Sequence, residues 1–306
     1  MSLATDTGHP QYAGTFIPEV WSTNLLVKFY RHTVFGAISN TDYEGEISGY
    51  GSKVYIRTVP SITIHDYVKG QDLQIETPES DNVELMIDKG KYFNFKVDDV
   101  DKYQSDLELM SLWSDDAGQQ MKIQIDSDIL ADIPADADPA NAGATAGAIS
   151  GDIDLGATGA PVSLDTTNVV DYITYLMQVL DEQDVPETDR AVVLPAWACN
   201  RIKRSELKDA SLAGDGTSTL RNGRVGMIDR ATIYHSNSVS KVTDGTDSVY
   251  NIIACHKSAL TFASQFTNME TIKSEKSFGD LVRGLNVFGY EVIKPEAMAH
   301  LYATPA

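Results

Sequence analysis

Runs of acidic residues are the feature of this sequence that comes nearest to a reactive site. One run lies near residue 100 and a second lies between residues 126 and 138; their members are Asp98, Asp99, Asp101, Asp126, Asp128, Asp132, Asp136 and Asp138. A calcium loop needs oxygen ligands at fixed positions, a glycine at the bend and a terminal glutamate. Neither run has that pattern, so we interpret both as solvated faces and predict no metal site.

The other residue types that carry enzyme chemistry are scattered along the chain. The six histidines contain no HExxH motif and no paired ligand spacing, and Cys199 and Cys255 lie far apart without a CxxC motif. No GxSxG nucleophile motif occurs, and the sequence around Gly49 and Gly51 lacks the GxGxxG pattern of a phosphate-binding loop. We predict no catalytic residue and no cofactor, and we expect both cysteines to be buried thiols made in a reducing cytoplasm.

The charge of the chain limits its partners. The formal net charge is -20 over 306 residues. Tight nucleic-acid binding depends mainly on Lys and Arg, which displace counterions, so this surface disfavours sequence-specific recognition of DNA or RNA. The sequence contains no run of 18 apolar residues, and its start lacks a basic region followed by an apolar one. Neither membrane insertion nor secretion is predicted.

The N-terminal segment is predicted to be an arm that carries a short amphipathic helix. Pro18 suits a first helical position, and apolar residues follow at close to helical spacing: Val20, Trp21, Leu25 and Phe29. This stripe could pack into the core of the same chain or against a neighbouring subunit, and the residues alone do not decide between the two.

Residues 43–97 predict a long β-hairpin. Period-two alternation marks two limbs, the first with Val54, Ile56 and Thr58 on one face and the second with Phe93, Phe95 and Val97 on one face. The polar middle, residues 65–82, is too long for an ordinary connection inside a compact domain, and connections of this kind are commonly functional or projecting. We expect the hairpin to reach away from the body of the protein.

The strongest helical signal lies at residues 105–133. Ser105 is a good N-cap, Pro134 marks the end, and apolar residues recur every three or four positions: Leu107, Met110, Trp113, Ala117, Met121, Ile125 and Ile129. A loop or linker at 136–161 precedes a second α/β unit. In that unit we predict helices at 166–181 and 195–207, a flexible loop at 209–219, a turn at 222–223, strands at 190–194, 225–235 and 250–255, a helical turn at 257–262, and C-terminal strands within 265–273 and 281–302.

Basic residues gather in one region of this acidic chain. They are Arg201, Lys203, Arg204, Lys208, Arg221, Arg224 and Arg230. They suit salt bridges to an acidic second copy of the chain, and they equally suit local acids of the same chain, since exposed pairs contribute little.

The order of these elements and several stretches of sequence resemble the tailed-bacteriophage major capsid proteins of the Hong Kong 97-type fold. The matching stretches are Phe16-Ile-Pro-Glu-Val-Trp-Ser22, Asn40-Thr-Asp-Tyr-Glu-Gly-Glu46, Val54-Tyr-Ile-Arg-Thr-Val-Pro60, Asp88-Lys-Gly-Lys-Tyr-Phe93, Val97-Asp-Asp-Val-Asp101, Arg221-Asn-Gly-Arg-Val-Gly226 and Ser277-Phe-Gly-Asp-Leu-Val-Arg-Gly284. None is a catalytic signature, and the match is specific only as an ordered set.

The resemblance implies an α+β capsid fold with a defined layout. Residues 1–42 would be the N-terminal arm, 43–97 the extended E-loop hairpin, 98–160 with 262–306 the peripheral domain with its spine helix at 105–133, and 161–261 the axial domain. Copies would form hexamers and pentamers of an icosahedral head that encloses double-stranded DNA. We expect contacts between subunits at Trp21, Phe29, Tyr67, Lys69, Arg201, Arg204, Arg221 and Arg224.

The resemblance also implies partners. Similar proteins assemble with a scaffolding protein and a portal protein, and in some cases a decoration protein, in the cytoplasm of the host bacterium before they become part of the virion. Some relatives crosslink a loop lysine to an asparagine, with a glutamate as base, and Lys69, Asn286 and Glu291 could take these parts. We do not expect the crosslink, because such a lysine must be desolvated to lose its proton.

Two alternatives to a phage shell remain open from the sequence. An encapsulin-like nanocompartment shares the fold and differs in enclosing a cargo enzyme. A metal-dependent enzyme that uses the acidic loop from Asp136 to Asp154 belongs to another class, and stabilisation by calcium or magnesium in thermal melting would reveal it.

Overall fold

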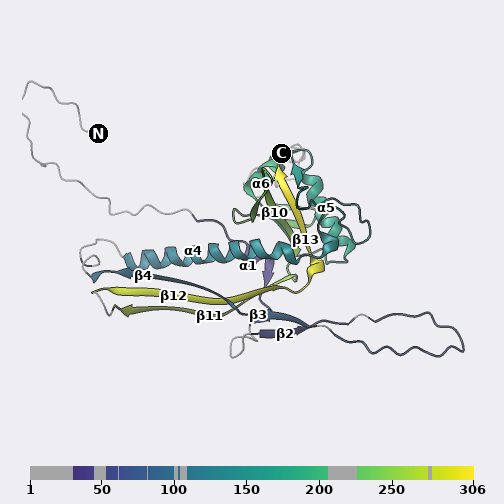
Figure 1. Cartoon of the computed structure of the whole chain (residues 1–306), viewed down its shortest axis with the longest axis horizontal. Coiled ribbons are helices and arrows are strands. Elements are labelled where there is room, and N and C mark those ends of the chain that lie inside the picture. The colour runs from purple at the N-terminus through teal and green to yellow at the C-terminus, as the bar shows by residue number, and fades with distance from the viewer. Residues whose placement is uncertain are drawn as a thin grey trace, which may run out of the picture.

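The structure, a computed structural model, describes residues 30–44, 53–60, 62–80, 82–99, 103, 109–205, 226–274 and 278–306. It combines helices and sheets in an elongated lobe, a rounded lobe and a projecting hairpin (Figure 1). The elongated lobe holds the longest helix and the longest strands, and the rounded lobe holds a mixed sheet with shorter helices. The mixed α+β class predicted from the sequence is confirmed.

The elongated lobe is a four-stranded sheet with a helix along it. The strand order is β1 (Ser39–Asn40), β11 (Leu260–Lys273), β12 (Asp280–Val292) and β4 (Lys89–Val97). Only β1 runs parallel to its neighbour; the other pairs are antiparallel. Helix α4 (Leu109–Asp132) contacts β4 through an aromatic pair, Phe95 and Trp113, whose ring centroids lie 5.8 Å apart, and through an ion pair of Lys91 with Asp128. It contacts β12 through a hydrogen bond that the Tyr290 hydroxyl donates to Asp132.

The helix predicted at residues 105–133 is confirmed from Leu109 to Asp132, and residues 105–108 lie outside the described residues. The predicted apolar stripe faces inward at its C-terminal end, where Ile125 and Ile129 are buried. Its 24 residues make a rod of roughly 36 Å. After Asp132 the chain continues as a 3₁₀ helix, η1 (Ile133–Asp136), with Pro134 in its first turn, where the fixed φ of proline is compatible.

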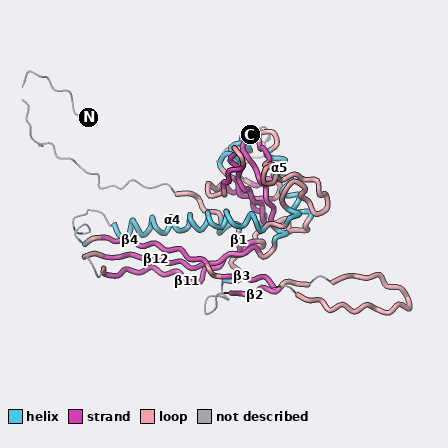
Figure 2. Tube along the Cα trace, in the orientation of Figure 1, coloured by secondary structure: helices cyan, strands magenta, loops and turns pink. Residues whose placement is uncertain are grey.

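The hairpin is built from β2 (Lys53–Arg57) and β3 (Asn82–Met86), which pair antiparallel. Beyond this ladder the described residues between the strands extend away from both lobes without regular secondary structure (Figure 2). The prediction that residues 93–97 form the second limb is wrong, because that segment pairs with β12. The period-two pattern is real, because Phe95 faces α4 and the residues between the aromatic ones are exposed on the other face of the sheet. Such alternation identifies a strand, but it does not show which other strand pairs with it.

The rounded lobe surrounds a sheet in the order β5 (Val162–Leu164), β13 (Met298–Pro305), β10 (Asp247–His256), β6 (Arg190–Leu194), β8 (Ala231–His235) and β7 (Met227–Ile228), with β9 (Lys241–Asp244) paired to β10. Helices α5 (Val169–Glu182) and α6 (Ala196–Arg204) lie at the predicted places. The strand predicted at 190–194 is confirmed as β6, which is buried along its whole length because it is a central strand.

Two predictions in this lobe need correction. The strand predicted at 225–235 is broken by a tight turn at Asp229 and Arg230, both with positive φ, between β7 and β8. The helical turn predicted at 257–262 is wrong from Leu260 onward, since a short turn there leads directly into β11. The predicted flexible loop at 209–219 and the turn at 222–223 lie outside the described residues.

The loop predicted at residues 136–161 is a loop, but it is packed rather than a free linker. It contains a second 3₁₀ helix, η2 (Pro139–Asn141), and buries Ala146, Ile153 and Leu155 in the main core. The buried Asn141 amide donates hydrogen bonds to the carbonyls of Glu296 and Met298, at 2.8 and 2.9 Å. This contact ties the loop to η3 (Pro295–Ala297) and to the start of β13.

One hydrophobic core extends through both lobes. It joins Ile125 and Ile129 of α4 with residues of α5, β6, β10, β11 and β12. A second, smaller core lies at the root of the hairpin. Asp126 on α4 is fully buried, so the interpretation of the second acidic run as a solvated face is wrong at this position. No described helix is long and apolar enough to cross a membrane.

Candidate functional site

The projecting part of the hairpin exposes apolar side chains that a soluble monomer would normally bury. Seven large apolar residues there are between 62% and 94% exposed: Val59, Ile62, Ile64, Tyr67, Val68, Leu73 and Ile75. A concentration of exposed apolar side chains on one segment is typical of a site of contact with another molecule. The predicted contact residues Tyr67 and Lys69 both lie in this segment.

The tip of the hairpin is a tight turn. The amide of Gln71 donates to the carbonyl of Val68 at 3.1 Å, and Gly70 has φ of 90° at the third position, which is the geometry of a type II turn. Lower down, Glu76 joins the two limbs by accepting from the amide of Thr63 at 3.1 Å and lying 3.5 Å from the imidazole of His65. The limbs therefore form one thin projection.

The root of the hairpin is anchored by the smaller core. Ile56 of β2 and Leu85 and Ile87 of the second limb are buried together with Ala263 of β11, and we call these four residues the hairpin-root core. Close backbone approach reinforces this anchor, since a Cβ atom placed on Gly289 would lie 2.0 Å from the carbonyl oxygen of Met86. Glycine at this position in β12 lets β3 cross the sheet in contact with it.

The face of the long sheet that bears Tyr92 is covered at one end by the hairpin root and is open around Tyr92 in the single chain. Strand alternation places Tyr92 and Asn94 on the side opposite to Phe95, which faces α4. Tyr92 is 79% exposed and lies opposite Leu285 of β12 in the register. A groove of about 420 Å³ lies here, lined on β4, β11 and β12 by Tyr92, Phe93, Asn94, Asn268, Glu270, Arg283, Gly284 and Leu285. The described chain thus has two uncovered apolar surfaces, one on the hairpin and one on the sheet.

Among the described residues, no group of three or more His, Cys, Asp or Glu side chains is placed to hold a metal ion. Burial raises the pKa of the Cys199 thiol to about 11 and that of Cys255 to about 12, so neither is a nucleophile near neutral pH. Burial also lowers the pKa of His300 to about 4, and its Nε2 atom lies 3.1 Å from Asn251 Oδ1 as a packed, neutral imidazole.

Comparison with known families decides the identity of a chain with this architecture. Residues 82–301, from β3 into β13, match the model of the family described as "Phage capsid protein". The chain belongs to this family. No curated protein matches the capsid protein.

Solved structures agree with the family. A chain from Mycobacterium phage Che8 superposes on the capsid protein with a TM-score of 0.77 and 29% identity, over 94% of this chain and 97% of that one. The capsid of cyanophage P-SCSP1u gives 0.71 with 17% identity over 95% and 94%, and the mature capsid of bacteriophage PhiM1 gives 0.68 with 15% identity over 95% and 94%. The function is that of a phage major capsid protein located in the virion, and the encapsulin alternative is not favoured.

The basic region of the capsid protein is partly engaged within the chain. Arg201 on α6 donates to a main-chain oxygen of Ala306 at 2.6 Å, and its guanidinium carbon lies 5.0 Å from the ring centroid of Trp197. Arg204 is exposed at the end of α6 and has no ion pair among the described residues. Its role and that of Arg201 in subunit contacts stay predictions. Four other predicted contact residues, Trp21, Phe29, Arg221 and Arg224, lie outside the described residues.

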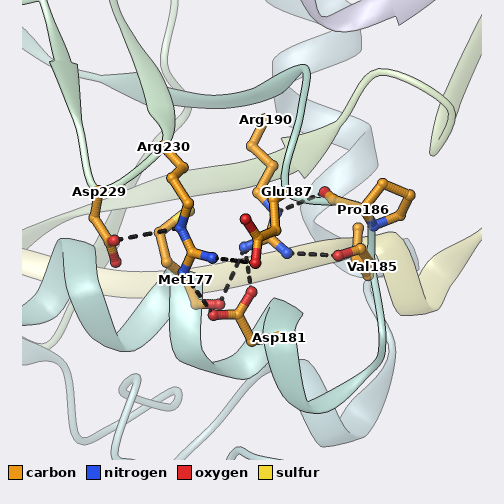
Figure 3. A network of polar contacts seen from close by, with 8 residues as sticks. All are labelled: Met177, Asp181, Val185, Pro186, Glu187, Arg190, Asp229 and Arg230. Carbon is orange, nitrogen blue, oxygen red and sulfur yellow. Dashed lines mark hydrogen bonds and ion pairs between the residues drawn. The ribbon is translucent and has the colours of Figure 1, made fainter.

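Arg230 and the buried Arg190 form the best-defined polar network of the capsid protein (Figure 3). Arg190 donates to the carbonyls of Val185 at 2.6 Å and Pro186 at 2.9 Å, and it pairs with Asp181 at 2.7 Å. Arg230 pairs with the same Asp181 at 2.9 Å and with Glu187 at 2.7 Å. At Arg230 the basic cluster thus balances local acids. Sequence reasoning missed Arg190, because no motif marks an arginine that is buried at the start of an apolar strand.

The residues considered for a crosslink are placed apart. Lys69 is exposed at the hairpin tip, and Asn286 accepts a hydrogen bond from the hydroxyl of Ser264 at 3.1 Å within the long sheet. Glu291, further along β12, has a pKa raised by burial and by the nearby Asp136 carboxylate. A raised carboxyl pKa suits a general base, but within one chain the three groups form no single site.

Proposed function

We propose that this capsid protein completes its fold by assembly, with the hairpin and the N-terminal arm of each copy covered by neighbouring copies in a closed shell. The observation that supports this most is the exposure of seven large apolar side chains on the hairpin. At roughly 25 cal/mol per Å² of apolar surface, covering them stabilises a contact between subunits far more than exposed ion pairs would. The open sheet face around Tyr92 is a second apolar surface available for such contacts.

The proposal includes the Hong Kong 97-type layout. The hairpin corresponds to the E-loop, α4 to the spine helix of a peripheral domain, and the rounded lobe to most of an axial domain. The boundaries predicted from the resemblance are 1–42, 43–97, 98–160 with 262–306, and 161–261. We change two of them: β4 pairs with β12 and belongs to the peripheral domain, and β13 pairs with β10 and belongs to the axial domain. One patch that meets a different patch on the next copy makes a heterologous contact, which closes into rings when the rotation permits. We infer that these rings are the hexamers and pentamers of an icosahedral head.

The remaining partners follow from the same proposal. Assembly takes place in the cytoplasm of the host bacterium with a scaffolding protein and a portal protein, with a decoration protein as a further partner. The head encloses double-stranded DNA without sequence-specific contacts, since the net charge of -20 disfavours binding to phosphates. No catalytic step by this chain is part of the proposal.

The hairpin test uses charge. In the double variant Ile64→Asp and Ile75→Asp, both side chains are at least 90% exposed, so the thermal melt of the single chain should be unchanged. Assembly should fail, because two carboxylates would have to be buried in the contact. Ile149→Asp is the matched control, since Ile149 is 81% exposed in the loop beside α5, where its amide donates to Glu182 Oε2 at 2.9 Å.

Electron microscopy and sedimentation of each variant, expressed with its scaffolding protein, report the outcome. Shells are expected from the wild type and from the Ile149→Asp control, and soluble unassembled protein from the double variant. Normal shells from the double variant would mean that the hairpin is not buried between copies, and the proposal would be abandoned.

A further inference from the structure

Residues 30–44, which we call the strap, connect α4 to the hairpin root. The strap begins beside α4, where the hydroxyl of Tyr30 donates to Asp116 Oδ1 at 2.9 Å. It then forms the single helical turn α1 (Phe35–Ile38) and the short strand β1 beside β11. Its last described residues reach the hairpin root, where the Ser264 amide donates to Glu44 Oε1 at 3.3 Å.

The carboxylate of Asp126 holds the middle of the strap against α4. Its Oδ1 atom accepts hydrogen bonds from the backbone amides of Val34 at 2.8 Å and Phe35 at 2.9 Å. These amides stand at the start of α1, where no preceding turn supplies an acceptor. Asp126 is fully buried, and its Oδ2 atom has no hydrogen-bond partner among the described residues. Burial of a half-satisfied carboxylate is unfavourable, so the fixation is only moderately strong.

The second half of the strap joins β11 and the hairpin root. The side chain of Asn40 donates to the carbonyl of Lys257 at 3.2 Å and accepts from the hydroxyl of Thr261 at 2.8 Å. Three residues further on, Tyr43 packs against the hairpin-root core. Ile38 belongs to the main core, so residues 39–42 alone separate the two cores along the strap. Fully extended, the five steps from Ile38 to Tyr43 could span at most roughly 16 Å, and a turn closed by the Glu44 amide on the Thr41 carbonyl at 3.1 Å shortens this connection.

From these contacts we propose that the strap couples α4 to the hairpin, with Asp126 as the positioning residue. Release of Val34 and Phe35 from Asp126 frees the strap to move, and movement at Tyr43 opens one wall of the hairpin-root core. The pairing of β1 with β11 covers only two residues, which is too short to hold the middle of the strap in place while one of its ends moves. Coupling of this kind is reciprocal, so loosening the hairpin root must also loosen the strap at Asp126.

Hydrogen–deuterium exchange on the full chain tests the coupling in the forward direction. Asp126→Ala removes the acceptor, and exchange at Val34 and Phe35 should rise about ten- to a hundredfold, as expected for charge-assisted bonds. Exchange in the β2–β3 ladder should rise about fivefold in the same variant, which corresponds to a coupling energy at the lower end of the usual range, about 1 kcal/mol. The control is Asp128→Ala. Asp128 lies two residues further along α4, is partly exposed and pairs with Lys91 at 2.6 Å. Its loss should change exchange neither at Val34 and Phe35 nor in the β2–β3 ladder.

The reverse direction uses Tyr43→Ala, which loosens the hairpin root directly. Exchange at Val34 and Phe35 should then rise although Asp126 is intact. If Asp126→Ala fails to fold, Asp126→Asn keeps a neutral acceptor and should produce a smaller rise in both regions. Faster exchange at Val34 and Phe35 without a change in the ladder, or the converse in Tyr43→Ala, would show two independent contacts and overturn the proposal.

Discussion

Alanine at position 289 should tilt the hairpin without unfolding the protein. The Cβ atom of the alanine would lie 2.0 Å from the Met86 carbonyl oxygen and 3.1 Å from Ile87 Cα. Ordinary van der Waals contact begins at 3.4 Å, so β3 must move away from β12 by about 1.4 Å at Met86. Over a five-residue strand of roughly 13 Å this is a rotation of about 6°. Tyr67 lies ten residues beyond Arg57, roughly 33 Å along the limb, and would move by about 3.5 Å.

The energetic effect should be modest for the single chain and large for the shell. Overpacking of this kind costs about 1–3 kcal/mol, which lowers the melting temperature by several degrees. A displaced tip can no longer meet its contact, so shell assembly should fail or become much slower. The control is Gly118→Ala, because a Cβ atom in that open part of α4 meets nothing within 4 Å and alanine should stabilise the helix by about 0.5–1 kcal/mol.

Differential scanning fluorimetry and electron microscopy of assembly reactions measure the two effects. If Gly289→Ala melts like the wild type and forms shells at the wild-type rate, then the backbone of β3 does not contact β12 at Gly289, and the close approach of the two strands is refuted. Failure of the Gly118→Ala control to assemble would instead place a contact on α4.

Two further predictions concern the rounded lobe. Arg190→Met should destabilise the protein by about 3 kcal/mol in urea unfolding, because it leaves the carbonyls of Val185 and Pro186 without their donor and removes one of the two arginines that pair with Asp181. Arg230→Ala should cost about 1 kcal/mol or less at its exposed site, and equal losses in the two variants would contradict this account. His300 has a pKa of about 4 in the folded protein, against 6.5 in the unfolded chain. The unfolded chain therefore takes up a proton first as the pH falls. The free energy of unfolding should decrease by roughly 3 kcal/mol between pH 6.5 and pH 4 because of this residue. His300→Gln, which can still bond to Asn251, should flatten that part of the pH profile, and an unchanged slope would assign it to other groups.

The sequence predicted best those elements whose own pattern determines them. The apolar run from Arg190 to Leu194 became the central strand β6, and the stripe through Ile125 and Ile129 became the buried face of α4. In both segments a single period and a sufficient length of apolar residues fix the element before any partner is known.

Predictions failed where the deciding partner is far away in the chain. Phe93 and Phe95 alternate as a limb of the hairpin would, but the partner of their strand is β12, almost 200 residues later. Asp126 resembles its solvated neighbours in the acidic run, and only the packing of Val34 and Phe35 on α4 makes it a buried acceptor. Likewise, no local signal shows that Gly289 is the point where another backbone crosses.

The two buried cysteines make the capsid protein almost silent to thiol reagents. With a pKa of about 11, Cys199 is roughly 0.03% thiolate at pH 7.5, and Cys255 with a pKa of about 12 still less. Since the whole sequence holds only these two, a cysteine introduced at the solvent-facing tip of the hairpin would react with maleimide essentially alone. A fluorophore or spin label could therefore follow that tip from the free subunit to the finished particle without removal of either native sulfur.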